Sequence, residues 1–65
     1  MKPGDKVWYF DNYYKVILSA IIKEIGYNYI LAYDTHTGML ISFNEHTLPF
    51  ESREALCEHY RKIFE

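Results

Sequence analysis

The sequence predicts a mainly β fold, a small barrel of about five strands followed by one C-terminal α-helix. Short runs rich in β-branched and aromatic residues alternate with Gly, Asn and Asp, which are common in turns. The C-terminal segment places apolar residues at the three- and four-residue spacing of a helix and ends in basic residues, as a helix favours. The chain has 65 residues, which is too short for two domains, so we expect a single domain over residues 1–65.

The first two strands are predicted from the N-terminal half of the chain. Residues 6–10 follow a Gly-Asp turn signal and are mostly aromatic or β-branched. A turn at Asp11-Asn12 leads into a long second strand over residues 14–25, which contains no glycine or proline. A strand that is apolar on both faces is either buried on both sides or carries a β-bulge that changes its phase. Both faces of this strand are apolar: Val16, Leu18, Ala20 and Ile22 on one, and Ile17, Ile21 and Ile25 on the other.

Three shorter strands are expected next, over residues 29–34, 39–43 and 48–50. The connection over residues 35–38 is a tight hairpin in which Gly38 can take a positive φ angle. Residues 44–47 are polar and long enough for one helical turn. The last strand is brief and lies at an edge, because Pro49 cannot donate a ladder hydrogen bond.

The helix is predicted over residues 52–64, with Ser52 as its N-cap and an acidic residue in its first turn. We expect this helix to belong to the core, because its apolar stripe would otherwise be exposed. The stripe contains Leu56, Cys57, Tyr60, Ile63 and Phe64. The barrel interior is assigned to Val7, Ile21, Ile30 or Leu31, Ile41 and Leu48.

The order of these elements resembles an SH3-like barrel. The resemblance rests on Gly4-Asp5-Lys6-Val7 at the entry to the first strand, three hairpins, the turn at residues 44–47 and a short fifth strand. The tail over residues 48–56 is similar to the ending of small uncharacterised SH3-like barrel proteins of bacterial mobile elements and phages. That resemblance implies a regulatory or counter-defence role. The loop at residues 11–13 is too short for the acidic specificity loop of a peptide-binding SH3 domain, which argues against proline-rich ligands.

Composition and charge exclude several classes of function. Seven basic and nine acidic residues give a net charge of about −2, so no overall field attracts nucleic acid or an anionic membrane. No apolar run reaches the roughly 20 residues of a membrane helix, and the N-terminus does not resemble a signal peptide. We therefore expect a cytoplasmic protein that does not enter the membrane. Cys57 is the only cysteine, so no disulfide can form within the chain.

No pattern in the sequence indicates catalysis, a metal or a cofactor. The run Asp34-Thr35-His36-Thr37-Gly38 only superficially matches an aspartic-protease signature, and that chemistry needs two carboxylates in one site. His36 and His46 have no predicted catalytic partner, and neither pairs at metal-ligand spacing with Cys57 or His59. The place of Cys57 on the apolar stripe favours a small buried side chain over a nucleophile. We expect no enzyme activity.

Aromatic residues are the unusual feature of the composition, at 18% of the chain with seven tyrosines. Tyrosine combines apolar area with a polar tip and is common at interfaces. Two of the turns carry tyrosines, and an SH3-like topology can bring these turns to the same end of a barrel. Trp8 points to the opposite side of its strand from Val7, where either the helix covers it or it is exposed. The candidate binding residues are Trp8, Tyr13, Tyr14, Tyr27 and Tyr29.

The leading hypothesis is a non-enzymatic interaction module that binds a protein partner, or a second copy of itself, through this aromatic surface. The alternative is a single-stranded nucleic-acid-binding barrel, which would stack bases on the aromatic rings. The charge balance argues against nucleic acid, because basic residues are offset by acidic ones along the barrel. A small-molecule pocket is a third class, for which no polar anchor stands out.

Overall fold

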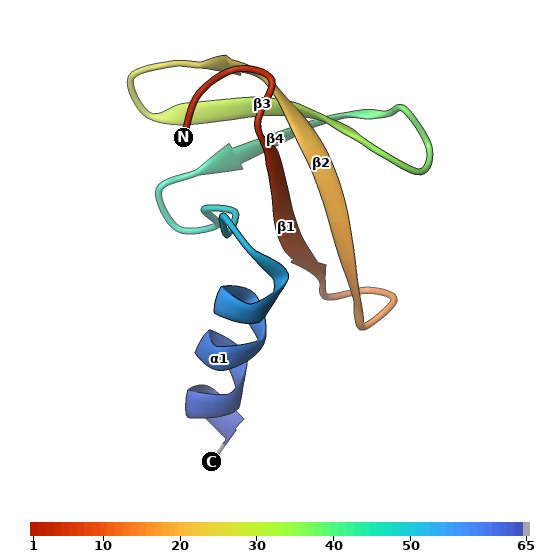
Figure 1. Cartoon of the computed structure of the whole chain (residues 1–65), viewed down its shortest axis with the longest axis vertical. Coiled ribbons are helices and arrows are strands. Elements are labelled where there is room, and N and C mark those ends of the chain that lie inside the picture. Colours follow the sequence, from red (N-terminus) through yellow and green to blue (C-terminus); the bar gives the residue numbers. More distant parts are fainter. Residues whose placement is uncertain (65) are drawn as a thin grey trace.

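Four antiparallel strands and one C-terminal helix make up the fold in the computed structural model of the chain, which describes residues 1–64 and the side chains of residues 1–61. The predicted mainly β class with one C-terminal helix is confirmed. The elements are β1 (Lys6–Asp11), β2 (Val16–Ile25), β3 (Tyr29–Asp34), β4 (Leu40–Asn44) and α1 (Arg53–Phe64). Figure 1 shows the β1–β2 hairpin running lengthwise, with β3 and β4 crossing at one end of it.

The strands form one sheet in the order β1-β2-β3-β4, and this sheet does not close into a barrel. The fifth strand predicted over residues 48–50 is reduced to one bridge, in which the N–H of Trp8 donates to Phe50 and the N–H of Phe50 donates to Trp8, both at 2.8 Å. Pro49 has no N–H, so the ladder cannot extend through it. The structure is therefore an open four-stranded sheet and not the predicted closed barrel of five strands. Residues 45–47 form a turn and not a helical turn.

β2 contains a β-bulge, which is one of the two explanations that the sequence left open for its two apolar faces. The pairing with β3 shifts between Ile22 and Glu24, so Lys23 is the extra residue. Before the bulge, even-numbered residues such as Ile22 share a face with Val7, whereas after it Ile25 moves to that same face by pairing with Ile30. The bulge thus allows a strand with mixed phase to keep one apolar face inward.

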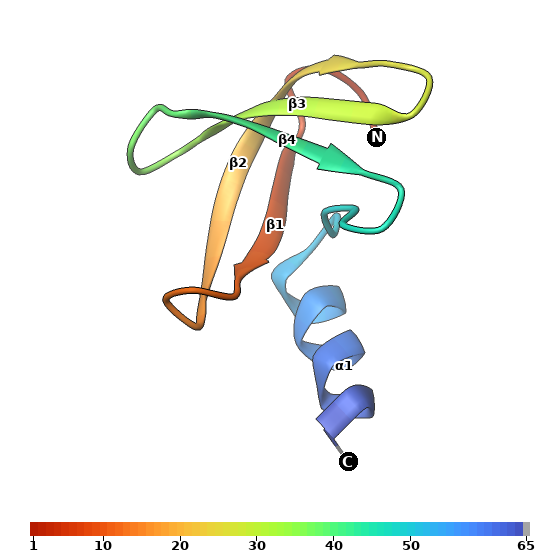
Figure 2. The same cartoon turned by 180° about the vertical axis from the view of Figure 1, so that it is seen from behind.

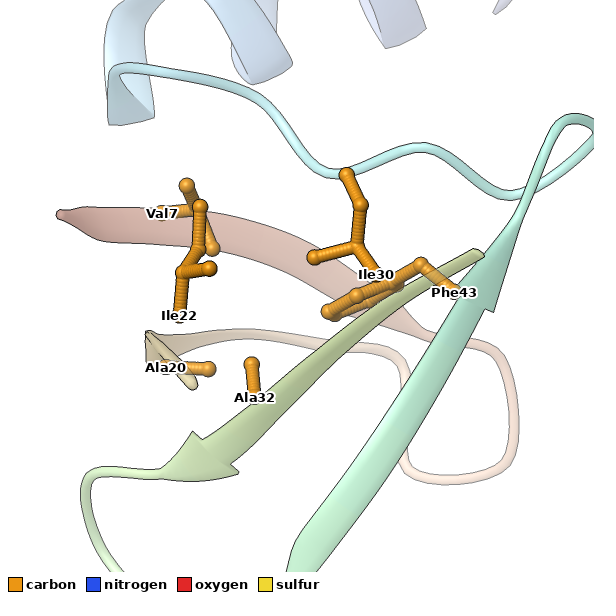
Figure 3. Packing of buried hydrophobic residues seen from close by; sticks show 6 residues of the cluster. All are labelled: Val7, Ala20, Ile22, Ile30, Ala32 and Phe43. Atoms are coloured by element: carbon orange, nitrogen blue, oxygen red, sulfur yellow. The ribbon is translucent and has the colours of Figure 1, made fainter. Parts of the chain in front are cut away.

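The core lies on this inner face of the sheet (Figure 3), where cross-strand neighbours Val7 and Ala20, Ile22 and Ala32, and Ile30 and Phe43 pack together. The predicted core residues Val7, Ile30 and Ile41 lie in this core or pack against it. Two predicted core residues are wrong. Ile21 is 37% exposed because its register with Lys6 and Tyr33 places it on the outer face, and Leu48 is 57% exposed because no strand forms around it.

The β1–β2 turn is longer than expected, so β2 starts at Val16 and not at residue 14. Asp11 holds this turn: its Oδ1 accepts the N–H groups of Tyr13 at 2.8 Å and Tyr14 at 3.0 Å. Lys15 closes the turn with a φ of 58°, a left-handed conformation that is rare outside glycine. In the β3–β4 turn, Gly38 takes the positive φ that its position predicted, at 76°.

α1 is capped as predicted, because the Oγ of Ser52 accepts the N–H of Ala55 at 3.0 Å. Figures 1 and 2 show that the helix begins near the end of β1 and extends beyond it, away from β3 and β4. It buries a narrow face: Leu56 is 1% exposed and Tyr60, one turn later, is half-buried. Cys57 is exposed, so its predicted burial is wrong; a residue next to Leu56 points about 100° away around the helix. The side chains of Ile63 and Phe64 lie outside the described residues. Within residues 1–64, no helix is long and apolar enough to cross a membrane.

Candidate binding groove

A groove of about 460 Å³ lies where the sheet fails to close, between the end of β1 and the free side of β4. β1 contributes Tyr9 and Phe10, and β4 contributes Ile41 to Phe43. The segment after β4 and the helix complete the wall with Leu48, Phe50 and Tyr60. The groove is therefore lined both by β4 and by Leu48 and Phe50 of the segment predicted as a fifth strand.

Phenylalanine and tyrosine rings form a large part of the groove wall and contact one another. Tyr9 meets Phe43 edge to face, with ring centroids 5.3 Å apart, and Phe10 lies 4.9 Å from Tyr60. Phe50 stands 5.1 Å from the ring of His59. Such pairs contribute about 0.5–1.5 kcal/mol each beyond the area they bury, so the wall is held in place by its own contacts.

The side chain of Tyr9 is held in place by a hydrogen bond to the carboxylate of Asp34. Its hydroxyl donates to Oδ2 of Asp34 at 2.5 Å, and Asp34 is only 6% exposed. Oδ1 of Asp34 accepts the N–H groups of His36 at 2.8 Å and Thr37 at 2.9 Å. The hydrogen bond from Tyr9, and then those from Thr37 and His36, hold the pKa of Asp34 below its usual value. Burial and the bond to Asp34 raise the pKa of the Tyr9 hydroxyl, so the pair remains a neutral phenol and an anion.

A second hollow of about 490 Å³ adjoins the groove at Leu48, which lines both. It lies over the β2–β3 turn and includes Ile25, Tyr27 and Tyr29. The ring of Tyr29 covers Gly26 so closely that any Cβ at residue 26 would overlap it. The Tyr29 hydroxyl donates to Glu24 at 2.9 Å, which fixes the ring and raises the pKa of the hydroxyl.

The predicted site residues do not form one cluster. Tyr13 and Tyr14 lie in the β1–β2 turn, 85% and 70% exposed, with their rings 4.8 Å apart. Tyr27 and Tyr29 lie in and after the β2–β3 turn, where Tyr27 is fully exposed and Tyr29 is 38% exposed. The two turns are at opposite ends of β2, whose ten residues span about 30 Å, so they do not share an end.

One of the two tyrosine pairs lines a hollow. Asn12 lines the groove and directly precedes Tyr13, while Tyr27 and Tyr29 line the second hollow. Trp8 is separate from both: it is half-buried on the outer face of β1, with Nζ of Lys6 5.4 Å from its ring centroid. Of the five predicted residues, Tyr27 and Tyr29 therefore line one of these two hollows, and Trp8, Tyr13 and Tyr14 line neither.

Sequence reasoning missed the groove residues Phe10, Phe43, Phe50 and Tyr60. Their spacing along the chain gives no signal, because the groove exists only where the sheet stays open. A usable clue was Pro49: a proline in a strand that had to close the barrel argued that the closure would be incomplete.

The polar residues of the groove carry amide, hydroxyl and imidazole groups. Asn12, Ser42, His46, Thr47 and His59 line it, and no carboxylate is among the described lining residues. His46 lies 3.6 Å from Glu45, but both side chains are more than 75% exposed. In the part of the chain that the structure describes, no group of three His, Cys, Asp or Glu residues is placed to hold a metal ion.

The fold and the groove together define a small mainly β protein with an open sheet and an aromatic surface hollow. No protein-family model matches this chain, and it has no match among curated proteins or among solved structures.

Proposed function

We propose that this protein is a non-enzymatic interaction module that binds an extended segment of a protein partner in the groove between β1 and β4. The observation that carries the proposal is the aromatic wall at the gap in the sheet, which leaves apolar rings beside the unpaired edge of β4. Extended peptides bind such edges with their backbone and place alternate side chains in pockets.

The lining chemistry indicates what the partner segment contains. Leu48 is 57% exposed between the two hollows and offers an apolar anchor point. With no carboxylate in the described groove wall, a basic segment has no counter-charge there. The favoured ligand is an uncharged segment with aromatic or aliphatic side chains.

The SH3-like arrangement is part of this proposal. The bridge between Trp8 and Phe50 puts residues 48–50 next to β1, on the side away from β2, which is where the last strand of such a barrel pairs. A host protein as partner, with a regulatory or counter-defence role for a mobile element or phage, is the biological setting that the resemblance suggests.

A displayed library of unstructured peptides tests the proposal. We expect enriched peptides to be aromatic or aliphatic and to shift the backbone NMR signals of Phe10, Ile41 and Phe50. Leu48→Asp should weaken their binding about tenfold or more, since a buried leucine contributes about 1.5–3 kcal/mol. Tyr33→Asp is the matched control, because Tyr33 is 41% exposed on the outer face. Failure to enrich any peptide, or equal losses in the two variants, would overturn the proposal.

Single-stranded nucleic acid is a second candidate ligand, favoured by two cation–aromatic pairs on the outer face. Lys6 lies 5.4 Å from the ring centroid of Trp8, and Lys23 lies 5.6 Å from that of Tyr33. Lys6 and Tyr33 share one row across the sheet, because both pair with Ile21. Two lysines release few counterions, so we expect weak binding. A titration of Trp8 fluorescence with a labelled oligonucleotide at roughly 0.15 M salt decides it, and micromolar affinity would favour this function.

A further inference from the structure

The two edges of the sheet differ in how they are protected. The edge of β1 carries Lys6, is bridged by Phe50 and lies beside α1. β4 pairs with β3 alone, and no other strand among the described residues lies along its free edge. Residues 35–44 contain no Lys, Arg, Asp, Glu or Pro, the residues that usually keep an edge strand from pairing. The β4 edge is therefore open to another strand.

The backbone groups that face this edge can be identified from the hydrogen-bond alternation of an antiparallel pair. The N–H of Asp34 donates to the C=O of Met39 at 2.9 Å, so Met39, Ile41 and Phe43 direct their backbone groups to β3. Leu40 and Ser42, in between, direct their N–H and C=O groups outward.

The neighbouring outward-facing groups on each side are already engaged. The N–H of Asn44 donates to Oγ1 of Thr47 at 3.1 Å, and its C=O accepts the N–H of Thr47 at 3.1 Å. The N–H of Gly38 donates to the C=O of Asp34 at 2.9 Å. Leu40 and Ser42 are thus the residues of β4 that still have both backbone groups to offer.

We propose that β4 pairs antiparallel with β4 of a second copy of this chain, with Ile41 on the two-fold axis. In this register Leu40 of each copy exchanges both backbone hydrogen bonds with Ser42 of the other. Moving the axis to Leu40 or Ser42 would require the engaged groups of Gly38 or Asn44. The contact is isologous, so it closes as a dimer and does not propagate.

A second copy fits this edge because the strand is complementary to itself. The first charged residue after β4, Glu45, lies opposite the neutral Thr37 in the proposed register, so like charges do not meet. Met39 and Leu40 are 66% and 51% exposed, and pairing would cover them with Phe43 and Ser42 of the other copy. A short strand edge provides less than the roughly 800 Å² per partner of a standard interface, so the expected dimer is weak.

Cysteine cross-linking tests the register directly. In a Cys57→Ser background, single cysteines replace Leu40, Ile41 or Ser42, and dimer formation under mild oxidation is measured on a non-reducing gel. Ile41 would face its own copy as a non-hydrogen-bonded pair, whose Cα separation of about 4.5 Å suits a disulfide. We expect Ile41→Cys to cross-link most. Maximal cross-linking at residue 40 or 42, or equal low yield at all three, would overturn the register.

Sedimentation velocity between roughly 10 and 500 µM measures the association itself. Ser42→Pro removes an outward N–H but no bond to β3, and should weaken dimerisation about tenfold or more, whereas Ser42→Ala keeps the N–H and should not. Circular dichroism confirms that both variants fold. A bound peptide and a second copy would both use the free edge of β4, so an enriched peptide should also dissociate the dimer. A monomer at every concentration would overturn self-pairing but not peptide binding. Conversely, Leu48→Asp should lose peptide binding and still dimerise, which separates this inference from the proposed function.

Discussion

Removing one hydroxyl, by the substitution Tyr9→Phe, tests whether the bond between Tyr9 and Asp34 stabilises the fold. The phenyl ring keeps its edge-to-face contact with Phe43, so the change isolates the 2.5 Å hydrogen bond. Asp34 is 94% buried and would keep its bonds from His36 and Thr37 while losing the donor at Oδ2. The variant therefore leaves a buried anion less completely bonded.

The expected loss at pH 7 is about 1.5–3 kcal/mol, the usual contribution of a hydrogen bond to a charged group. A chain of 65 residues has roughly 3–10 kcal/mol of unfolding free energy, so the loss is a large fraction of it. The pKa of Asp34 is lowered in the folded state, so its contribution is present above the ordinary value of 3.8 and is lost as pH falls through the folded-state pKa. The difference between wild type and variant should therefore shrink toward pH 3.

Urea unfolding at pH 7 and pH 3, followed by Trp8 fluorescence and far-ultraviolet circular dichroism, measures both quantities. Tyr27→Phe is the matched control, because Tyr27 is fully exposed. We expect it to change the unfolding free energy by less than about 0.5 kcal/mol. The reasoning is refuted if Tyr9→Phe behaves like Tyr27→Phe at pH 7, or if its loss is the same at both pH values.

Three further substitutions test local features, each measured by urea or thermal unfolding. Gly26→Ala should lower the unfolding free energy by about 1–3 kcal/mol, because the new Cβ overlaps the Tyr29 ring. Adding Tyr29→Ala should recover part of that loss, whereas strictly additive effects of the two substitutions would contradict the clash. Lys15→Gly should stabilise by about 0.5–1 kcal/mol by relieving a φ of 58°, and Lys15→Ala should give no such gain. Leu56→Ala should lower the unfolding free energy by about 2–5 kcal/mol, and Cys57→Ala should leave it almost unchanged. Similar losses in these two variants would show that α1 packs through a different face.

The secondary structure was largely predictable because local chemistry specifies it. β3 has the predicted bounds, β1, β2 and β4 differ from theirs by one or two residues, and the fifth predicted strand is reduced to one bridge. The cap at Ser52 and the positive φ of Gly38 follow from side-chain and backbone properties that act within a few residues. The apolar pattern of β2 also indicated a bulge, although it did not identify Lys23 as the bulged residue.

The candidate site was predicted less well, since it depends on contacts between distant segments. The tyrosines were correctly recognised as a surplus in composition, and four of the five predicted residues are more than a third exposed or line a hollow. Their grouping failed because consecutive hairpin turns lie at opposite ends of the strand between them. Cys57 was assigned to the interior from helical spacing, but how wide a helix face is buried depends on what packs against it.

By itself, the sequence determined a mainly β chain with a C-terminal helix, the places of its turns, and an excess of aromatic rings over what a small interior can hold. Only the tertiary structure decided that the sheet stays open, because closure depends on whether residues near Pro49 find ladder partners on both β1 and β4. They find one at Trp8. The open sheet creates the aromatic groove and leaves a free edge at Leu40 and Ser42. Residue spacing along the chain predicts neither the groove nor this edge. Both depend on which backbone groups from distant segments remain unpaired.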